Sequence, residues 1–284
     1  MNISDGSIPF HYETTGEGMP FLAIHGWGVD HRLMSGCLEP VFSGNDAGLS
    51  CRRIYPDLPG MGKTPGPETV TGADDLLASL LDFIDFAIPD GRFLLAGESF
   101  GGYLSRAVLR KMPERIAGLL LIAPAVRPFI KTDTGFDKGD VPEHRVIEED
   151  AEFMNALGAE ESDAFRYMGV RLTRDCWNRF SRDVIPGIRA ADKRFLENNL
   201  GANPFLSVNP DEGMAPFGRP TAIITGRQDA SVGYRDMWSL IENFPRATYA
   251  CLDGAGHNLQ TERVPLFESL VRDWLERVAR QGDA

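Results

Sequence analysis

Short apolar runs alternate with stretches of helical periodicity through the first part of the chain. Three of these runs predict strands, at residues 20–24, 93–96 and 119–122, a further strand is expected over 52–55, and a less regular strand is expected over 8–14. Before the run at 93–96, apolar side chains recur at the spacing of one helix face: Leu76, Leu77, Leu80, Leu81 and Ile84. This alternation predicts right-handed crossovers, and therefore an α/β fold with a mostly parallel sheet flanked by helices.

The pattern changes after Pro124. From 125 to 219, charged residues and short amphipathic runs dominate, and prolines and glycines interrupt them repeatedly. We interpret 125–219 as an inserted, mostly helical cap, and residues 1–124 together with 220–284 as one core domain. Beyond the cap, the sequence predicts strands at 220–225 and 247–252 and a closing helix with the apolar face Phe267, Leu270, Val271, Trp274, Leu275 and Val278.

The composition is that of a globular protein with enough apolar residues for a packed core, since 43% of its 284 residues are hydrophobic and 25% are charged. The net charge of −12 at pH 7 argues against a nucleic-acid surface and against attraction to anionic membranes. No stretch approaches the about 18 consecutive apolar residues of a membrane-spanning helix. We therefore expect a small-molecule substrate and no nucleic-acid or membrane partner. The sequence does not indicate an oligomeric state.

The cysteines are scattered along the chain, at Cys37, Cys51, Cys176 and Cys251. They form no paired motif and no cluster with histidines, so we predict neither a zinc site nor a disulfide framework. Residues 1–6 lack the basic and apolar regions of a signal peptide. Reduced thiols without a signal peptide predict a cytoplasmic protein.

The chain is organised around the turn at Ser99. The apolar run 93–96 stops at Gly97 and helical spacing begins at Phe100, so a strand reverses into a helix around this serine. Gly97 and Gly101 flank the turn, where side chains would force strand and helix apart. This context is that of the G-x-S-x-G nucleophile elbow, which presents a serine hydroxyl at the N-terminus of a helix. That end of a helix suits an oxyanion.

Two later loops carry the groups that a serine nucleophile requires, namely a base and a carboxylate that orients the base. Asp229 and His257 each follow a predicted strand, and the loops after parallel strands meet at one sheet edge. We therefore predict that Ser99, His257 and Asp229 converge. Alternatives remain at this stage: Asp229 could cap a helix, His257 could be structural, and Asp211 or Asp253 could supply the carboxylate.

Five motifs occur in the order found in the α/β-hydrolase superfamily: His25-Gly26-Trp27-Gly28, Asp57-Leu58-Pro59-Gly60-Met61-Gly62, Gly97-Glu98-Ser99-Phe100-Gly101-Gly102, Gly226-Arg227-Gln228-Asp229 and Gly254-Ala255-Gly256-His257. The chain resembles the capped serine hydrolases of this superfamily over essentially its whole length. The resemblance implies the α/β-hydrolase fold, Ser99 as nucleophile, His257 as general base and then acid, and Asp229 as orienting carboxylate. It also implies an oxyanion hole from the backbone N–H groups of Trp27 and Phe100.

The expected reaction is transfer of an acyl group to water through an acyl-enzyme, with a small or medium carboxylic ester as substrate. It requires no metal and no organic cofactor. A thioesterase, a C–C bond hydrolase or an iminopeptidase could use the same residues, and the cap sequence does not choose among them. In a different class, a hydrolase-fold receptor for a small molecule would show little turnover, and a scaffold with a dead site would show none.

Other polar residues in these motifs have structural interpretations. Glu98, beside the nucleophile, is expected to be a solvated or structural carboxylate. We expect His25 to make a structural hydrogen bond within its loop and Asp57 to fix its own loop. His11 and His31 we interpret as surface or incidental residues.

Overall fold

The protein is described here from a computed structural model that covers residues 9–43, 49–127, 130–132, 135–137 and 141–282. Residues 1–6, which we examined for a signal peptide, lie outside these ranges. Ile8, where the first strand was expected to begin, also lies outside them.

A mixed sheet forms the centre of the described structure, with strand order β1-β3-β2-β4-β5-β10-β11. Its strands are β1 (Tyr12–Thr15), β2 (Met19–Ile24), β3 (Cys51–Pro56), β4 (Phe93–Glu98), β5 (Ile116–Ile122), β10 (Thr221–Gly226) and β11 (Ala247–Leu252). Only β1 pairs antiparallel, with β3, and the remaining pairings in this sheet are parallel. The predicted α/β class with a mostly parallel sheet is therefore confirmed.

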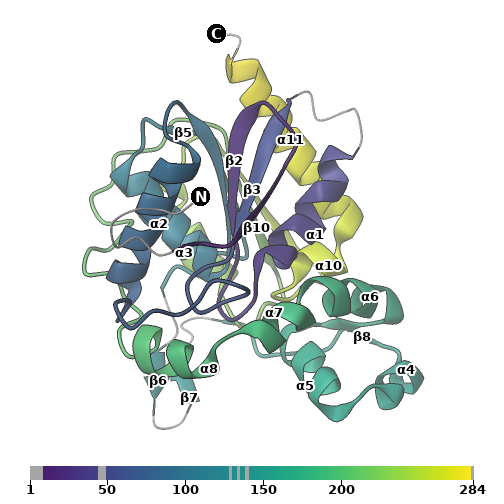
Figure 1. Ribbon diagram of the computed structural model, residues 1–284. Helices are drawn as coiled ribbons and strands as arrows, with labels where there is room; N and C mark the ends of the chain where they lie inside the picture. The colour runs from purple at the N-terminus through teal and green to yellow at the C-terminus, as the bar shows by residue number, and fades with distance from the viewer. Residues whose placement is uncertain (1–8, 44–48, 128–129, 133–134, 138–140, 283–284) are drawn as a thin grey trace.

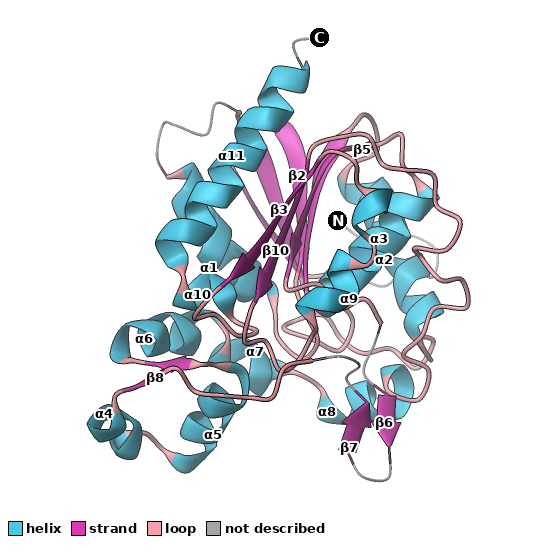
Figure 2. Ribbon diagram, turned by 180° about the vertical axis from the view of Figure 1, so that it is seen from behind, coloured by secondary structure: helices cyan, strands magenta, loops and turns pink. Residues whose placement is uncertain are grey.

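Helices cover both faces of this sheet (Figures 1 and 2). One face carries α1 (His31–Phe42) and α11 (Val264–Gly282), and the other carries α2 (Ala73–Ala87) and α3 (Phe100–Lys111). The central strands are buried on both sides because helices shield them, and every residue of β4 is buried. The apolar face predicted for the last helix packs inward, with Trp274 fully buried and Leu270 at its partly buried margin.

The chain between β5 and β10 consists of small elements beyond the carboxyl ends of the strands (Figure 1). These elements are β6 (Ile130–Thr132), β7 (Gly135–Asp137), β8 (Glu148–Glu149), α4 (Ala151–Ala156), α5 (Ala159–Met168), β9 (Arg171–Leu172), α6 (Arg174–Asp183), α7 (Ile185–Ala190), α8 (Lys193–Phe195) and the π-helix η1 (Leu196–Leu200). Phe165, Phe180 and Trp177 contact one another there, with edge-to-face and tilted rings, as a local aromatic cluster. Treating 125–219 as a separate cap stays a prediction.

A buried ion pair ties the end of this region to α3. Arg106 is fully buried, and its Nε and Nη2 donate to the two carboxylate oxygens of Asp211 at 2.8 and 3.2 Å. One turn earlier, the Tyr103 hydroxyl accepts a hydrogen bond from the Leu206 backbone N–H at 3.0 Å. Because Asp211 is committed to Arg106, it is not available to orient His257.

Candidate active site

The turn at Ser99 has the geometry that its flanking glycines suggest. Ser99 has φ 51° and ψ −117°, a backbone conformation that residues with side chains rarely adopt. A Cβ on Gly97 would overlap the Gly101 carbonyl oxygen, and a Cβ on Gly101 would overlap the Ile24 carbonyl oxygen. Strand and helix can therefore pack this closely only with glycine at both positions.

The structure brings Ser99, His257 and Asp229 into one hydrogen-bonded chain. His257 Nε2 lies 3.0 Å from Ser99 Oγ, and His257 Nδ1 lies 2.9 Å from Asp229 Oδ2. These contacts arise because β10 and β11 pair in parallel with Gly226 opposite Leu252, which sets the two following loops side by side. All three side chains are buried, and Ser99 is 4% exposed.

Asp229 is oriented by its own turn as well as by His257. Its Oδ1 accepts the backbone N–H groups of Ser231 at 2.7 Å and Val232 at 3.0 Å, which leaves Oδ2 for the imidazole. The alternative carboxylate Asp253 instead accepts a hydrogen bond from the Gln228 side chain at 2.9 Å. Asp229 therefore fixes its own turn and contacts the histidine, but the alternative of a helix cap is wrong, because α9 (Tyr234–Trp238) has Gly233 at its N-cap.

Two backbone N–H groups beside Ser99 are available to an oxyanion. Within the described residues, the N–H groups of Trp27 and Phe100 donate no hydrogen bond to a protein acceptor. Their residues are neighbours because β2 and β4 pair with Ile24 opposite Gly97, and the two rings meet edge to face at 5.2 Å. A free donor at the start of α3, next to a second donor on an adjoining loop, suits a tetrahedral intermediate.

Glu98 was expected to be either a solvated or a structural carboxylate, and its burial decides between the two. Its side chain is only 2% exposed, so the expectation of a solvated carboxylate is wrong. Its Oε1 lies 3.5 Å from His257 Nε2. Burial raises the pKa of Glu98 to about 7, an effect that nearby His257 opposes and Asp229 reinforces. A glutamate next to an elbow serine carries no sequence signal for burial, because its depth depends on which loops pack over it.

Comparison with known proteins places this geometry in a family. The family model described as "Alpha/beta hydrolase family" matches residues 21–269. The chain belongs to the alpha/beta hydrolase family. An alpha/beta superfamily hydrolase from Oenococcus oeni PSU-1 superposes with a TM-score of 0.84 and 26% identity, covering 97% of this chain and 99% of that one. The expected family and fold are therefore confirmed.

Curated relatives of this alpha/beta hydrolase are also hydrolases. A 2-hydroxy-6-oxononadienedioate/2-hydroxy-6-oxononatrienedioate hydrolase of Burkholderia vietnamiensis is 27% identical, over 97% of this chain and 94% of the relative. A pimeloyl-[acyl-carrier protein] methyl ester esterase of Legionella pneumophila is 24% identical, over 94% of this chain and 99% of the relative. Family and relatives together indicate a hydrolase of a small-molecule substrate.

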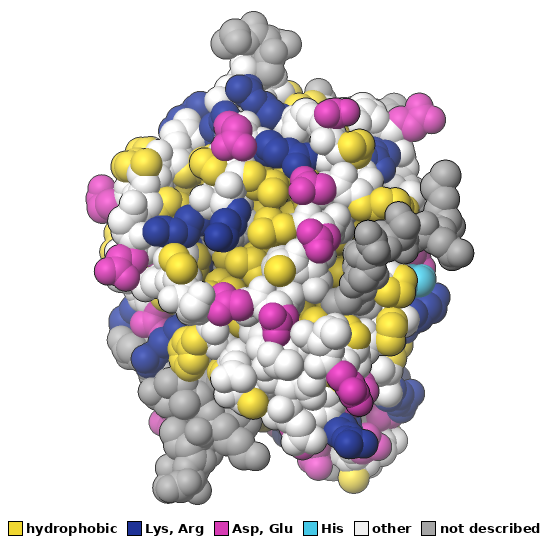
Figure 3. All heavy atoms as spheres, turned by 60° about the vertical axis from the view of Figure 1, so that its left-hand side comes forward, with side chains coloured by type: hydrophobic (Ala, Val, Ile, Leu, Met, Phe, Trp, Pro, Cys, Tyr) yellow, Lys and Arg dark blue, Asp and Glu magenta, His cyan; other side chains and the backbone are white. Residues whose placement is uncertain are grey.

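Two observations bear on other partners of this hydrolase. Among the described residues, no helix is both long enough and apolar enough to cross a bilayer. Figure 3 shows hydrophobic side chains on one face of the molecule, surrounded by basic and acidic groups in mixture. That face therefore lacks the basic stripe of nucleic-acid-binding proteins. The cytoplasmic location stays a prediction.

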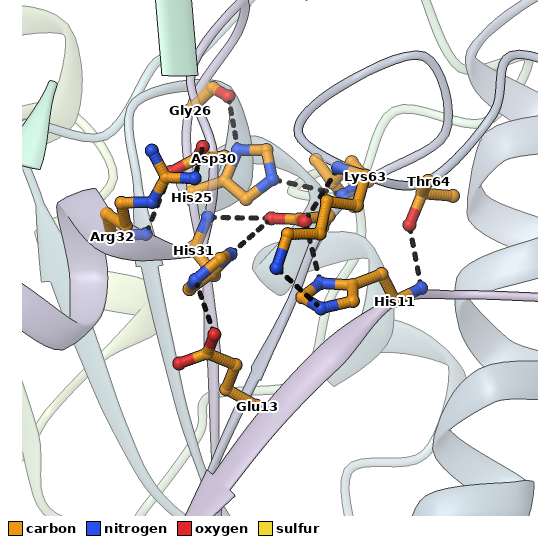
Figure 4. A network of polar contacts seen from close by, with 11 residues as sticks. His11, Glu13, His25, Gly26, Asp30, His31, Arg32, Lys63 and Thr64 are labelled. Atoms are coloured by element: carbon orange, nitrogen blue, oxygen red, sulfur yellow. Dashed lines mark hydrogen bonds and ion pairs between the residues drawn. The ribbon is translucent and has the colours of Figure 1, made fainter. Parts of the chain in front are cut away.

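A polar network supports the loop that carries Trp27 (Figure 4). His25 Nδ1 donates to the Gly26 carbonyl oxygen at 2.7 Å, and its Nε2 accepts the Leu58 backbone N–H at 3.0 Å. This confirms the expected structural hydrogen bond of His25. Burial lowers the pKa of His25, so the ring stays neutral with its proton on Nδ1. His25 thus couples the loop after β2 to the loop after β3.

Asp57 anchors the loop after β3, as we expected. Its Oδ1 accepts the backbone N–H and the Nδ1 of His31 at 2.9 and 2.7 Å, and its Oδ2 accepts His11 Nδ1 and the Lys63 backbone N–H, both at 2.9 Å. His31 is buried, so the interpretation of it as a surface residue is wrong. The sequence offered no signal for this contact because the residues lie on separate elements.

The same three side chains, His11, His31 and Asp57, lie close enough together to be considered as a metal site. Each oxygen of Asp57 already accepts two hydrogen bonds, so neither has a lone pair left for a metal ion. The outer nitrogen of His11 lies 3.5 Å from the Lys63 ammonium, which would repel a cation. We therefore interpret the cluster as a clamp on the loop.

Glu262 connects the loop of His257 to the start of β9. This carboxylate is 7% exposed. Its Oε1 accepts the backbone N–H groups of Val170 at 2.6 Å and Arg171 at 3.0 Å, and its Oε2 accepts the Gly256 N–H at 2.6 Å. One side chain therefore holds the residue before His257 and the start of β9 at a set distance. The sequence analysis did not identify this contact.

Proposed function

We propose that this alpha/beta hydrolase cleaves a small or medium carboxylic ester through an acyl-enzyme on Ser99. The observation that carries the proposal is the chain of hydrogen bonds from Asp229 through His257 to Ser99, beside two unbonded backbone N–H groups. A serine hydroxyl in contact with a base, and a base held by a carboxylate, form an activated nucleophile.

In the proposed reaction, Ser99 Oγ attacks the ester carbonyl carbon while its proton moves to His257 Nε2. The oxyanion receives hydrogen bonds from the backbone N–H groups of Trp27 and Phe100. The intermediate collapses, and the alcohol leaves with the proton from His257. Water then gives up a proton to His257 and attacks the acyl-enzyme. The bond to Ser99 Oγ breaks, His257 returns the proton to Ser99 Oγ, and the acid is released. Asp229 keeps the imidazole in the required tautomer throughout. No step calls on a metal or an organic cofactor.

A second candidate is hydrolysis of a C–C bond in a small oxo acid, which would use the same three residues. It is favoured by the similarity to the Burkholderia vietnamiensis hydrolase of 2-hydroxy-6-oxononadienedioate, which extends over nearly the whole chain. The Legionella pneumophila relative, a methyl ester esterase, favours the ester. Thioester and iminopeptide substrates, and a receptor with little turnover, have no such observation in their favour.

The test is hydrolysis of p-nitrophenyl esters over a series of acyl chain lengths, with a dienone oxo acid as the C–C substrate. Ser99→Ala is compared with Ser79→Ala, a control in which a helical serine that donates to the Asp75 carbonyl is lost. We expect many turnovers by wild type and by the control, and a loss of about 10⁴-fold or more in Ser99→Ala. Equal activity of Ser99→Ala refutes the mechanism. A single-turnover burst supports the receptor, and faster C–C cleavage supports the second candidate.

A further inference from the structure

Glu98 places a second carboxyl group against His257. Its Oε2 hydrogen-bonds the Gly26 backbone N–H, and a Cβ on Gly26 would overlap this oxygen. Its Oε1 has no hydrogen-bond partner among the described residues and lies 3.5 Å from His257 Nε2. A buried polar atom without a partner is costly, so it calls for an explanation.

The two carboxyl groups face different nitrogens of one imidazole. Asp229 contacts Nδ1, which keeps its proton throughout the proposed reaction. Glu98 lies near Nε2, which gains the serine proton and then gives it away. The Oε1 atom therefore has no partner while the imidazole is neutral, and it faces a positive charge, with Nε2 3.5 Å away, when the imidazolium forms. An interaction that is stronger in the transition state than in the ground state accelerates the chemical step.

We propose that Glu98 is a positioning residue whose ionised carboxylate stabilises the imidazolium form of His257 from the Nε2 side. The inference rests on the proposed function, since it assumes that His257 accepts the proton of Ser99. The active form then has a neutral His257 and an ionised Glu98. Reaching it from the fully protonated enzyme requires the loss of two protons rather than one.

The surroundings of Glu98 fit this role. The titratable groups that act on it are His257 and Asp229, on the loops after β11 and β10, and Cys37 on α1. Burial raises the pKa of the Cys37 thiol well above its usual value, so it stays neutral. Burial also raises the pKa of Glu98 to about 7, which places its ionisation in the range where histidine titrates.

The experiment measures the rate at which a neutral phosphonate ester labels Ser99, from about pH 5 to about pH 8.5, in wild type and Glu98→Gln. For wild type we expect the logarithm of the rate to rise with a limiting slope of about two, and for Glu98→Gln a slope of about one with an about tenfold lower plateau. Glu98→Asp, which keeps the charge, should retain the steeper slope. For ester turnover, kcat should fall in Glu98→Gln while KM stays unchanged.

Several outcomes would overturn the inference. A wild-type slope of about one does so without any variant, so the test holds even if Glu98→Gln fails to fold. An unchanged slope in a folded Glu98→Gln, checked by its thermal midpoint, assigns Glu98 a packing role only. If the phosphonate still labels Ser99 in wild type when one of these two outcomes is found, the proposed function survives. If Ser99 does not label at all, both the proposed function and this inference fail.

Discussion

Asp229→Asn changes one oxygen to nitrogen, and the structure dictates which way the new amide faces. The backbone N–H groups of Ser231 and Val232 both donate to Oδ1, so the amide oxygen must stay there. The NH₂ group is therefore directed at His257 Nδ1, 2.9 Å away, where it can only donate. To accept that bond, the imidazole must move its own proton from Nδ1 to Nε2. The nitrogen that faces Ser99 Oγ then has no lone pair with which to act as a base.

The magnitude follows from that tautomer. The same substitution in the triad of a serine protease lowers kcat by about 10⁴-fold, and the geometry here predicts a similar loss, which corresponds to about 5 kcal/mol of transition-state stabilisation. The free energy of unfolding should change far less, because the amide keeps both backbone hydrogen bonds. KM should stay within about twofold, because Asp229 is buried behind His257 and takes no part in binding the substrate.

The assay is kcat and KM for p-nitrophenyl butyrate, measured together with urea unfolding. Asp253→Asn is the matched control, since this exposed carboxylate precedes His257 by four residues and bonds Gln228 instead. We expect the control to behave as wild type. Asp229→Asn with a folded structure and more than about one tenth of wild-type kcat would refute the tautomer mechanism. So would equal impairment of the two variants.

The remaining predictions concern the contacts that support the site. Glu262→Gln removes an anionic acceptor of three backbone N–H groups, so urea unfolding should show a loss of about 2 kcal/mol together with a lower kcat; an unchanged kcat would contradict a role in holding the His257 loop. Asp211→Asn leaves buried Arg106 without its counter-charge and should cost about 3 kcal/mol in the same assay, and a loss below about 0.5 kcal/mol would count against the pair. Burial lowers the pKa of His31, but the hydrogen bond and charge of Asp57 outweigh it and the net shift is upward from 6.5. The contribution of His31 to the free energy of unfolding should therefore be complete below about pH 6.5 and should fall as the pH rises through the pKa of His31 in the folded protein. In wild type, the free energy of unfolding should then be higher at about pH 6 than at about pH 8.5 by an amount that His31→Gln reduces. The same pH difference in wild type and variant would contradict this.

Much of the architecture followed from local pattern. The sequence pattern predicted β2, β3, β4, β5, β10 and β11, because a strand that helices shield on both faces is largely apolar. It did not predict the short strands β6, β7, β8 and β9, which lie in the region expected to be mostly helical. The glycines at 97 and 101 indicated the elbow because their Cβ positions are occupied by backbone. The order of Ser99, Asp229 and His257 was informative because parallel strands deliver their loops to one edge. For the strands, the physical cause lies within a few residues of the signal.

Other features of the site depended on residues far apart in the sequence. Whether Glu98 meets solvent depends on how the loops of Gly26 and His257 pack over the end of β4, and the pattern around Glu98 carries no trace of either loop. Glu262 likewise has its role only because the start of β9 lies next to it in the folded protein. It accepts hydrogen bonds from backbone N–H groups, which every residue except proline carries, so no pattern of side chains indicates the contact. The sequence by itself determined the strands of the central sheet, the elbow and the candidate residues, because burial periodicity and turn sterics leave a local pattern. Only the tertiary structure decided the charge environment of His257, because desolvation and electrostatic interactions depend on distance in space and not on separation along the chain.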